Sequence, residues 1–220
     1  MDFTNIKIDD LNINLPLSST NLLVGQSSVG KTNFCEKLCG LVPSKILIND
    51  YVIDNFQNIK YFSNDYLFLS NSIIEEISSE YINMFDINKN PNNLLLFDKI
   101  KLFILSEEDS ESEIVVFDNI YDLIDFNNKI KFHNLINKYI PNKTILITSN
   151  NLSNCNLFDN IYLLNDNITN INDIYINRDL IESNRLELPF ILNLSNKLSY
   201  YNLIDKPYEN IDQMVGDLWK

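Results

Sequence analysis

The segment Gly25-Gln26-Ser27-Ser28-Val29-Gly30-Lys31-Thr32 has the G-x-x-x-x-G-K-[ST] spacing of a phosphate-binding loop. It follows the apolar run Leu22–Val24, which predicts a short buried strand, and it opens into a stretch with apolar side chains at helical spacing up to Leu41. The chain has only four glycines, so two of them at this spacing after a strand argue against a chance match.

The chemistry of this loop indicates a nucleoside triphosphate as the ligand. Glycines let backbone N–H groups turn inward around an anion, and the N-terminus of the following helix adds a favourable dipole. We expect Lys31 to contact the β- and γ-phosphates and the Thr32 hydroxyl to bind Mg²⁺. The residues predicted to bind the nucleotide are Gly25, Gln26, Ser27, Ser28, Val29, Gly30, Lys31, Thr32 and Asn33.

A second element of a phosphate site is Asp118, which ends the apolar run Ile114–Phe117. In a phosphate-loop fold, a strand that ends in Asp places its carboxylate beside the loop hydroxyl, so Asp118 is predicted to share Mg²⁺ with Thr32. The next residue is Asn119. Many hydrolysing enzymes of this class have a glutamate there to orient or deprotonate the attacking water, and an amide cannot act as a base.

Strand-like and helix-like segments alternate along the chain, which predicts an α/β fold with a largely parallel sheet. Ser72 to Glu75 has the form of a capping box and predicts a helix running to about Phe85. Residues after Asp173 are predicted to be mostly helical. The other expected helices are Leu94–Leu105 and Phe126–Tyr139, and the other expected strands are Ile6–Leu15 (one or two strands), Ile46–Ile48, Ile59–Phe62, Thr144–Thr148 and Ile161–Leu164.

Composition narrows the classes of partner and compartment. The formal net charge is −13 and there is no Lys/Arg cluster, which disfavours extended binding to a nucleic-acid backbone. The cysteines Cys35, Cys39 and Cys155 form no even disulfide framework, so a reducing compartment is expected, cytoplasmic or matrix-like. No stretch approaches the length of a membrane span, so direct membrane insertion is not expected. His133, the single histidine, is expected at a surface or half-buried position.

The order of these segments resembles the nucleotide-binding domain of ABC ATPases over roughly residues 1 to 168. Asn21–Leu41 is similar to that family's phosphate loop and helix, and Glu113–Asp118 to its second nucleotide motif. The colinearity of the weaker matches supports the resemblance. These matches are Lys45–Asn49, Ile59–Asp65 (the Q-loop), Leu67–Ile73, Asp122–Asp125 (the D-loop) and Lys143–Leu164 (the switch strand and the strand after it).

Three positions that carry catalytic side chains in this family differ here. Asn64 stands at the Q-loop glutamine, Asn119 at the catalytic glutamate and Ser149 at the switch histidine. The signature segment should fall near Leu94–Asp98, where the sequence is Leu-Leu-Leu-Phe-Asp. The interval between Asn64 and Leu94 is short for a full helical subdomain, so a reduced one is expected.

The resemblance implies an ATP-binding domain over residues 1–168 and a mostly helical extension over residues 169–220. We expect Mg-ATP binding with slow or absent hydrolysis by the isolated chain. The implied partner is a second ATPase subunit or a membrane permease, through which the chain would sit peripherally on a membrane. The alternative is a soluble P-loop motor or packaging-type ATPase, for which a strand ending in Asp-Asn would be ordinary. A small-molecule kinase is disfavoured because no Arg-rich lid is evident.

Overall fold

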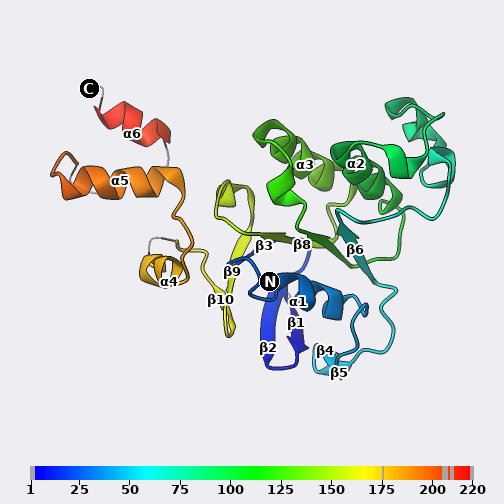
Figure 1. Cartoon of the computed structure of the whole chain (residues 1–220), viewed down its shortest axis with the longest axis horizontal. Helices are drawn as coiled ribbons and strands as arrows, with labels where there is room; N and C mark the ends of the chain where they lie inside the picture. Colours follow the sequence, from blue (N-terminus) through cyan, green and yellow to red (C-terminus); the bar gives the residue numbers. More distant parts are fainter. Residues whose placement is uncertain (1–2, 175, 205–207, 209–210, 219–220) are drawn as a thin grey trace.

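The structure, a computed structural model, describes residues 3–174, 176–204, 208 and 211–218 and contains two sheets (Figure 1). The central six-stranded sheet has the order β10-β9-β3-β8-β7-β6, and the second sheet has the order β2-β1-β4-β5. The central strands are β3 (Thr20–Val24), β6 (Ile59–Ser63), β7 (Ile114–Asp118), β8 (Thr144–Ser149), β9 (Asn160–Leu164) and β10 (Ile168–Asn170). The strands of the second sheet are β1 (Phe3–Ile8), β2 (Leu11–Pro16), β4 (Ile46–Ile48) and β5 (Tyr51–Val52).

The central sheet is parallel from β6 to β9, and only β10 runs antiparallel to its neighbour. The predicted α/β class with a mostly parallel sheet is confirmed. Its central strands β3, β7 and β8 are buried at every position, as expected for a parallel sheet that is covered on both faces. Along β3, Leu22 and Val24 contribute to one core while Leu23 contributes to the other, because successive side chains point to opposite faces.

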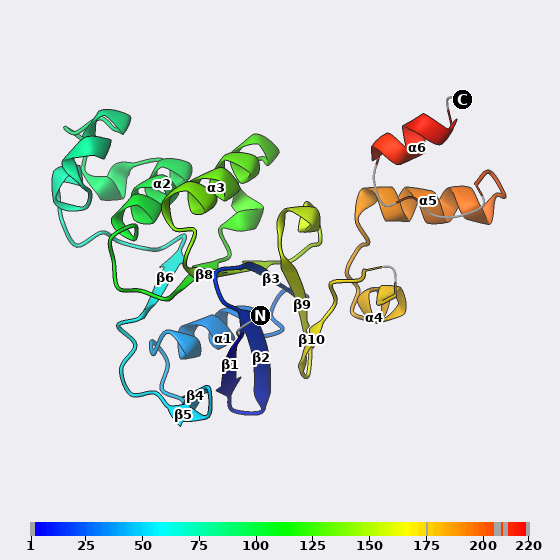
Figure 2. The same ribbon diagram turned by 180° about the vertical axis from the view of Figure 1, so that it is seen from behind.

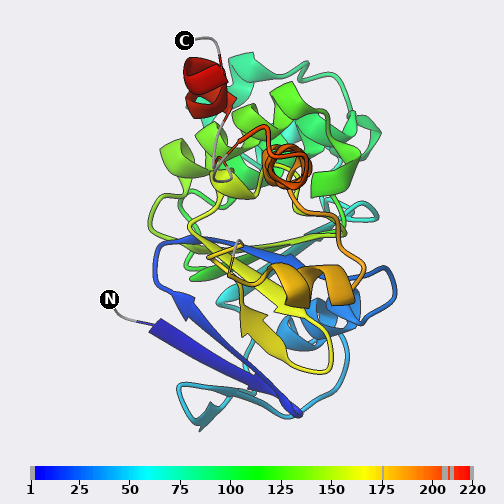
Figure 3. The ribbon, with the colours of Figure 1, turned by 90° about the vertical axis from the view of Figure 1, so that its left-hand side faces the viewer.

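One core lies between the central sheet and the antiparallel sheet, and α1 (Lys31–Leu38) lies between them (Figure 3). Phe34, Cys35 and Leu38 of α1 are buried in this layer, which explains the helical spacing of the apolar residues after the phosphate loop. The predicted segment Ile6–Leu15 forms two strands, β1 and β2, joined by a tight turn at Asp9.

The other core lies on the opposite face of the central sheet, which α2 (Leu96–Ser106) and α3 (Phe126–Tyr139) cover (Figure 2). Helix α3 has the predicted bounds, and the Asp125 side chain caps it by accepting a hydrogen bond from the Asn128 N–H. The segment between β6 and β7 contains one α-helix, α2, and three short 3₁₀ turns, consistent with a reduced helical subdomain.

The helix predicted from Ser72 to about Phe85 was wrong. The segment forms two 3₁₀ turns, η1 (Ile73–Glu75) and η2 (Ser79–Met84), and the Ser72 side chain caps neither of them. The Glu76 carboxylate instead accepts hydrogen bonds from the backbone N–H and hydroxyl of Ser70. Local side-chain bonds of this kind compete with helix formation. The third turn is η3 (Pro91–Asn93), which the Asn90 side chain caps by accepting a hydrogen bond from the Asn92 N–H.

After β9 the chain passes through β10 and three helices, α4 (Arg178–Ser183), α5 (Phe190–Tyr200) and α6 (Ile211–Leu218). The mostly helical character expected after Asp173 is confirmed for the described residues. In Figure 1 these helices lie on the β10 side of the central sheet, with α5 and α6 farthest from it. None of the helices in the described ranges is long and apolar enough to cross a bilayer.

His133 is more deeply placed than expected. It is only 6% exposed, its Nε2 lies 3.2 Å from the Tyr121 hydroxyl, and its ring packs against Phe158. Burial lowers the pKa of His133 to about 4, and the carboxylate of Asp159 only partly offsets this shift. The imidazole is therefore neutral in the folded protein at physiological pH.

This burial predicts a loss of stability in mild acid. Between pH 6.5 and 4 the unfolded chain binds a proton at His133 and the folded chain does not. The free energy of unfolding therefore decreases as the pH falls through this window. From pH 7 to pH 5 the loss from this group should be about 2 kcal/mol. Urea unfolding at both pH values measures it, and His133→Gln should remove most of the difference. An equal acid loss in the variant would contradict this assignment.

Candidate nucleotide-binding site

The phosphate loop connects the end of β3 to the start of α1, as the sequence predicted. Ser28 and Gly30 have φ angles of 67° and 108°, in the left-handed region that turns backbone N–H groups toward a common point. A Cβ on Gly25 would lie 2.7 Å from the carbonyl oxygen of Leu164, so close packing against β9 requires glycine there. Ser27, Ser28 and Asn33 are exposed, leaving the mouth of the loop open.

Lys31 is folded into its own loop. Its side chain is buried, and Nζ donates to the carbonyl oxygens of Gly25 and Gln26 at 2.7 and 2.9 Å. A third bond goes to Oδ1 of Asn150, at 2.9 Å. Burial lowers the pKa of Lys31, and the carboxylates of Asp122 and Asp118 oppose this shift. Three neutral oxygens thus hold a buried cation beside the open loop, where phosphate oxygens would make stronger, charge-assisted bonds.

Asp118 ends β7 and is buried, with both carboxylate oxygens engaged. Oδ1 accepts a hydrogen bond from the Thr148 hydroxyl at 2.7 Å, and Oδ2 accepts one from the Tyr61 hydroxyl at 3.1 Å. Burial, and secondarily the Asp118 charge, raise the pKa of Tyr61 well above its usual range, so its phenol remains a donor. Two hydroxyl donors hold the carboxylate in one orientation at the end of the strand.

Asn119 joins the two predicted metal ligands. Its Nδ2 donates to the Thr32 hydroxyl oxygen at 2.8 Å and lies 3.3 Å from Oδ2 of Asp118. One polar nitrogen thus sits between the hydroxyl and carboxylate oxygens, the types of atom that coordinate Mg²⁺. The oxygens of Thr32 and Asp118 therefore fit the metal predicted from the sequence. Among the described residues, no cluster of three or more His, Cys, Asp or Glu side chains offers another metal site.

Asn119 also has an unusual backbone. Its φ of 54° lies in the left-handed region, which asparagine tolerates better than most residues. Its N–H donates to the Thr148 hydroxyl at 2.9 Å, which links the end of β7 to β8. This backbone conformation directs the amide toward Thr32, so the position predicted for a water-activating group does lie at the loop.

Ser149 is buried, and its hydrogen bonds indicate a structural role rather than a catalytic one. Its hydroxyl donates to Asp122 at 2.6 Å, and the N–H of Asn150 donates to the other oxygen of the same carboxylate at 2.7 Å. Asp122 also accepts from Nδ2 of Asn151 at 3.1 Å. Asp122, in the segment that resembles a D-loop, therefore holds the loop after β8. The residue of this loop that reaches Lys31 is Asn150 rather than Ser149.

Asn64 lies on the same edge of the sheet, but its side chain makes no hydrogen bond to the other site residues that the structure describes. The parallel register pairs Ser63 with Asp118, so Asn64 and Asn119 follow neighbouring strands at the same end. Asn64 is exposed, and the hydrogen bonds within the described ranges include none to its side chain. Of the three predicted catalytic positions, Asn119 therefore contacts the loop directly, at Thr32. Ser149 is linked to the loop only through the next residue, Asn150, which bonds Lys31.

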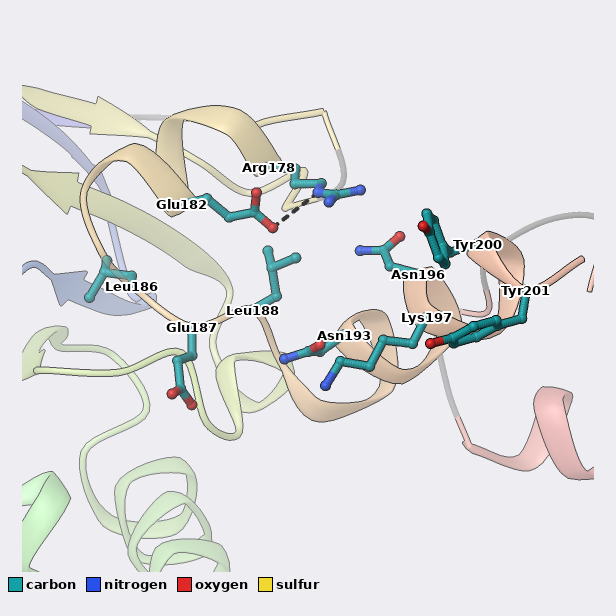
Figure 4. Close-up of a pocket in the computed structure, with 10 residues that line it drawn as sticks. All are labelled: Arg178, Glu182, Leu186, Glu187, Leu188, Asn193, Asn196, Lys197, Tyr200 and Tyr201. Atoms are coloured by element: carbon teal, nitrogen blue, oxygen red, sulfur yellow. Dashed lines mark hydrogen bonds and ion pairs between the residues drawn. The ribbon is translucent and has the colours of Figure 1, made fainter.

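Four partners of the site residues were not predicted from the sequence as parts of the site: Tyr61, Thr148, Asn150 and Asn184. Tyr61 lies within a strand-like run and Thr148 near the end of another, and only strand order places their hydroxyls on Asp118. Asn184 follows α4, and its carbonyl oxygen accepts a hydrogen bond from Nε2 of Gln26 at 2.8 Å. The cleft of about 570 Å³ between α4 and α5 (Figure 4) lies outside the phosphate loop, because none of the loop residues lines it.

Comparisons with known proteins found one curated relative and several solved structures with the same fold. No profile of a known protein family matches the sequence. Among curated proteins, the chain is 23% identical over 252 aligned residues to the energy-coupling factor transporter ATP-binding protein EcfA1 of Oenococcus oeni. That alignment covers 97% of this chain and 91% of the relative.

Solved structures of ABC transporters share the fold. A bacterial Atm1-family ABC exporter with ATP bound matches with a TM-score of 0.64 at 13% identity, over 81% of this chain and 41% of the exporter chain. The chain thus spans less than half of that exporter chain. A transporter described as of the metal-chelate ABC type, in an inward-facing conformation, matches with a TM-score of 0.59 at 15% identity, over 81% of this chain and 88% of that one. The chain thus has the fold of ABC transporter ATP-binding domains and is similar in sequence, along nearly its whole length, to a transporter ATP-binding protein.

Proposed function

We propose that the chain is the ATP-binding subunit of an ABC-type transporter, with residues 1–168 as the nucleotide-binding unit and slow or absent hydrolysis on its own. The observation that carries this proposal is the arrangement of Lys31, Thr32, Asn119 and Asp118 at one edge of a parallel sheet. The names of the relatives support ATP as the nucleotide, since one is an ATP-binding protein and another holds ATP.

Binding would use the loop and the end of β7. The loop N–H groups and the ammonium of Lys31 would contact the phosphates, while Thr32 and Asp118 would hold Mg²⁺, which neutralises phosphate charge when bound. The Thr148 and Tyr61 hydroxyls orient Asp118 for this role. Asn119 would have to release Thr32, because its amide donates to the oxygen that the metal would use.

Hydrolysis lacks a base at the position where the family carries one. The amide of Asn119 can orient a water molecule but cannot accept its proton, and general-base catalysis contributes roughly 10²–10⁴-fold where it operates. Ser149 carries no charge and its hydroxyl is already bonded to Asp122. Asn64, exposed on the same edge, could bind a metal-bound or attacking water only through its amide.

A membrane partner is proposed from the segment after β6. Leu67 and Leu69 are 68% and 102% exposed, and Ile74 is half exposed, although they flank the buried Phe68 and Ile73. Exposed apolar side chains clustered in one segment mark interaction surfaces more often than isolated ones do. We propose that this surface contacts a permease, which would hold the chain peripherally on the cytoplasmic face of a membrane.

The proposal is tested by titrating the purified chain with Mg-ATP in a calorimeter and measuring phosphate release by the same preparation. We expect saturable binding together with phosphate release close to the rate without protein. Absence of binding at millimolar Mg-ATP would refute the proposal. Rapid release that increases further on adding duplex DNA would instead favour a motor or packaging ATPase, the class that the sparse cations of this chain disfavour.

A further inference from the structure

The turn after α4 is fastened to the phosphate loop. Nε2 of Gln26 donates to the Asn184 carbonyl oxygen at 2.8 Å, across a sequence separation of 158 residues. Ile181 and Leu186, on either side of the turn, are 0% and 5% exposed and belong to the core that covers the central sheet. The turn is therefore anchored to the body of the domain and also touches the loop proposed to bind phosphate.

Arg185 occupies a strained position in this turn. Its φ of 53° lies in the left-handed region, where glycine or asparagine normally ends a helix. Backbone bonds hold it there, because its N–H donates to Glu182 and the Leu186 N–H donates to Ile181. These bonds hold the backbone of Arg185 in one conformation at the end of α4.

The Arg185 guanidinium has no partner within the described ranges. Its side chain is exposed, and the ion pairs and hydrogen bonds of the described residues include none to it. The chain's other arginine, Arg178, differs: its Nε donates to Glu182 at 3.1 Å, one turn along α4, beside the cleft in Figure 4. The two arginines, seven residues apart, therefore form a natural pair of test and control.

The site itself is short of positive charge. Lys31 is the cation within the loop, and the carboxylates of Asp122 and Asp118 act on it electrostatically. Ser149, next to the Asn150 that bonds Lys31, carries no charge. A nucleoside triphosphate would add several negative charges to a chain whose net charge is already −13. Arg185 follows Asn184, the residue that contacts Gln26, and its side chain would add positive charge beside the loop.

We propose that Arg185 binds the phosphate groups of the nucleotide held by the loop of the same chain. This inference rests on the proposed function and assigns it a second cation beyond Lys31. A guanidinium presents a planar fork of donors that matches two phosphate oxygens, and it stays charged at any working pH. The turn fixes the backbone of Arg185, and the preceding residue, Asn184, is bonded to the loop. Only the rotamer of the Arg185 side chain therefore has to change on binding.

The experiment compares Arg185→Gly with Arg178→Ala in calorimetric titrations of the full chain with Mg-ATP. Glycine suits the left-handed turn, so Arg185→Gly should keep the wild-type melting temperature within a few degrees while removing the charge. Because hydrogen bonds to charged groups are strong, we expect its Kd for Mg-ATP to rise about tenfold. Arg178→Ala should bind as the wild type does, and Arg185→Lys should fall between the two.

The outcomes separate this inference from the proposed function. If the wild type binds Mg-ATP and Arg185→Gly binds it within twofold of the wild type, Arg185 does not contact the phosphates and the inference is overturned. An equal loss in Arg178→Ala would also overturn it, because the effect would then be a general one of charge. If the wild type does not bind Mg-ATP, the proposed function fails and the inference falls with it.

Discussion

Lys31→Ala should abolish the thermal stabilisation that Mg-ATP gives to the wild-type chain. A ligand present at 100 times its Kd stabilises the folded state by about 2.7 kcal/mol. For a domain of this size that corresponds to a rise in Tm of roughly 5–10 °C. Lys31 is the buried cation of the loop, and alanine removes the ammonium that would contact the phosphates. Differential scanning fluorimetry with and without Mg-ATP measures the shift.

The control for this prediction is Lys37→Ala. Lys37 lies on the same helix, α1, but its ammonium pairs with Asp9 at the surface, 2.6 Å away, so its loss should leave the nucleotide-induced shift intact. The readout is the shift rather than the absolute Tm, because Lys31 also holds two carbonyl oxygens of its own loop. An undiminished shift in Lys31→Ala would contradict the nucleotide site.

Asn119→Glu should increase phosphate release from Mg-ATP by at least tenfold. Nδ2 of Asn119 lies 2.8 Å from the Thr32 hydroxyl oxygen and close to the Asp118 carboxylate. A carboxylate at this position would therefore stand where a base is needed. The neighbouring negative charge of Asp118 would raise the pKa of the new carboxyl toward neutral pH, which improves it as a base. Steady-state phosphate release by wild type and variant at saturating Mg-ATP gives the ratio.

Asn119→Gln is the matched control, because it has the length of glutamate without the ability to accept a proton. Its rate should stay at the level of the wild type. Equal rates in the glutamate and glutamine variants would mean that the missing base does not limit turnover. A partner that completes the site would then be the next explanation to examine.

Local patterns predicted those parts of the fold whose hydrogen bonds close within a few residues. The bounds of α3 were predicted because Asp125 caps its own helix and Pro141 follows its end. The helix expected from Ser72 failed for a related reason. Its cap was inferred from the spacing of Ser72 and Glu75, whereas the structure bonds Glu76 to Ser70, a choice that spacing alone does not reveal.

The candidate site likewise has parts that local patterns predicted and contacts that they did not. The loop from Gly25 to Thr32 and the strand ending at Asp118 are continuous stretches whose chemistry depends on spacing, so they can be recognised from the order of residues alone. The contacts of Asn119 with Thr32, and of Asn150 with Lys31, join residues 87 and 119 positions apart. They depend on the order of β3, β7 and β8 in the sheet.

By itself the sequence determined that this chain has a phosphate loop, an acidic strand end and the alternating elements of an α/β fold, because each is a short-range pattern of glycine, charge or apolar spacing. Only the tertiary structure decided which side chains meet there. It placed an amide between the two predicted metal ligands, gave Lys31 its partner Asn150, and brought the turn at Asn184 and Arg185 against Gln26. These contacts depend on the strand order and on the burial of Ile181 and Leu186. Both are determined by the packing of the whole chain.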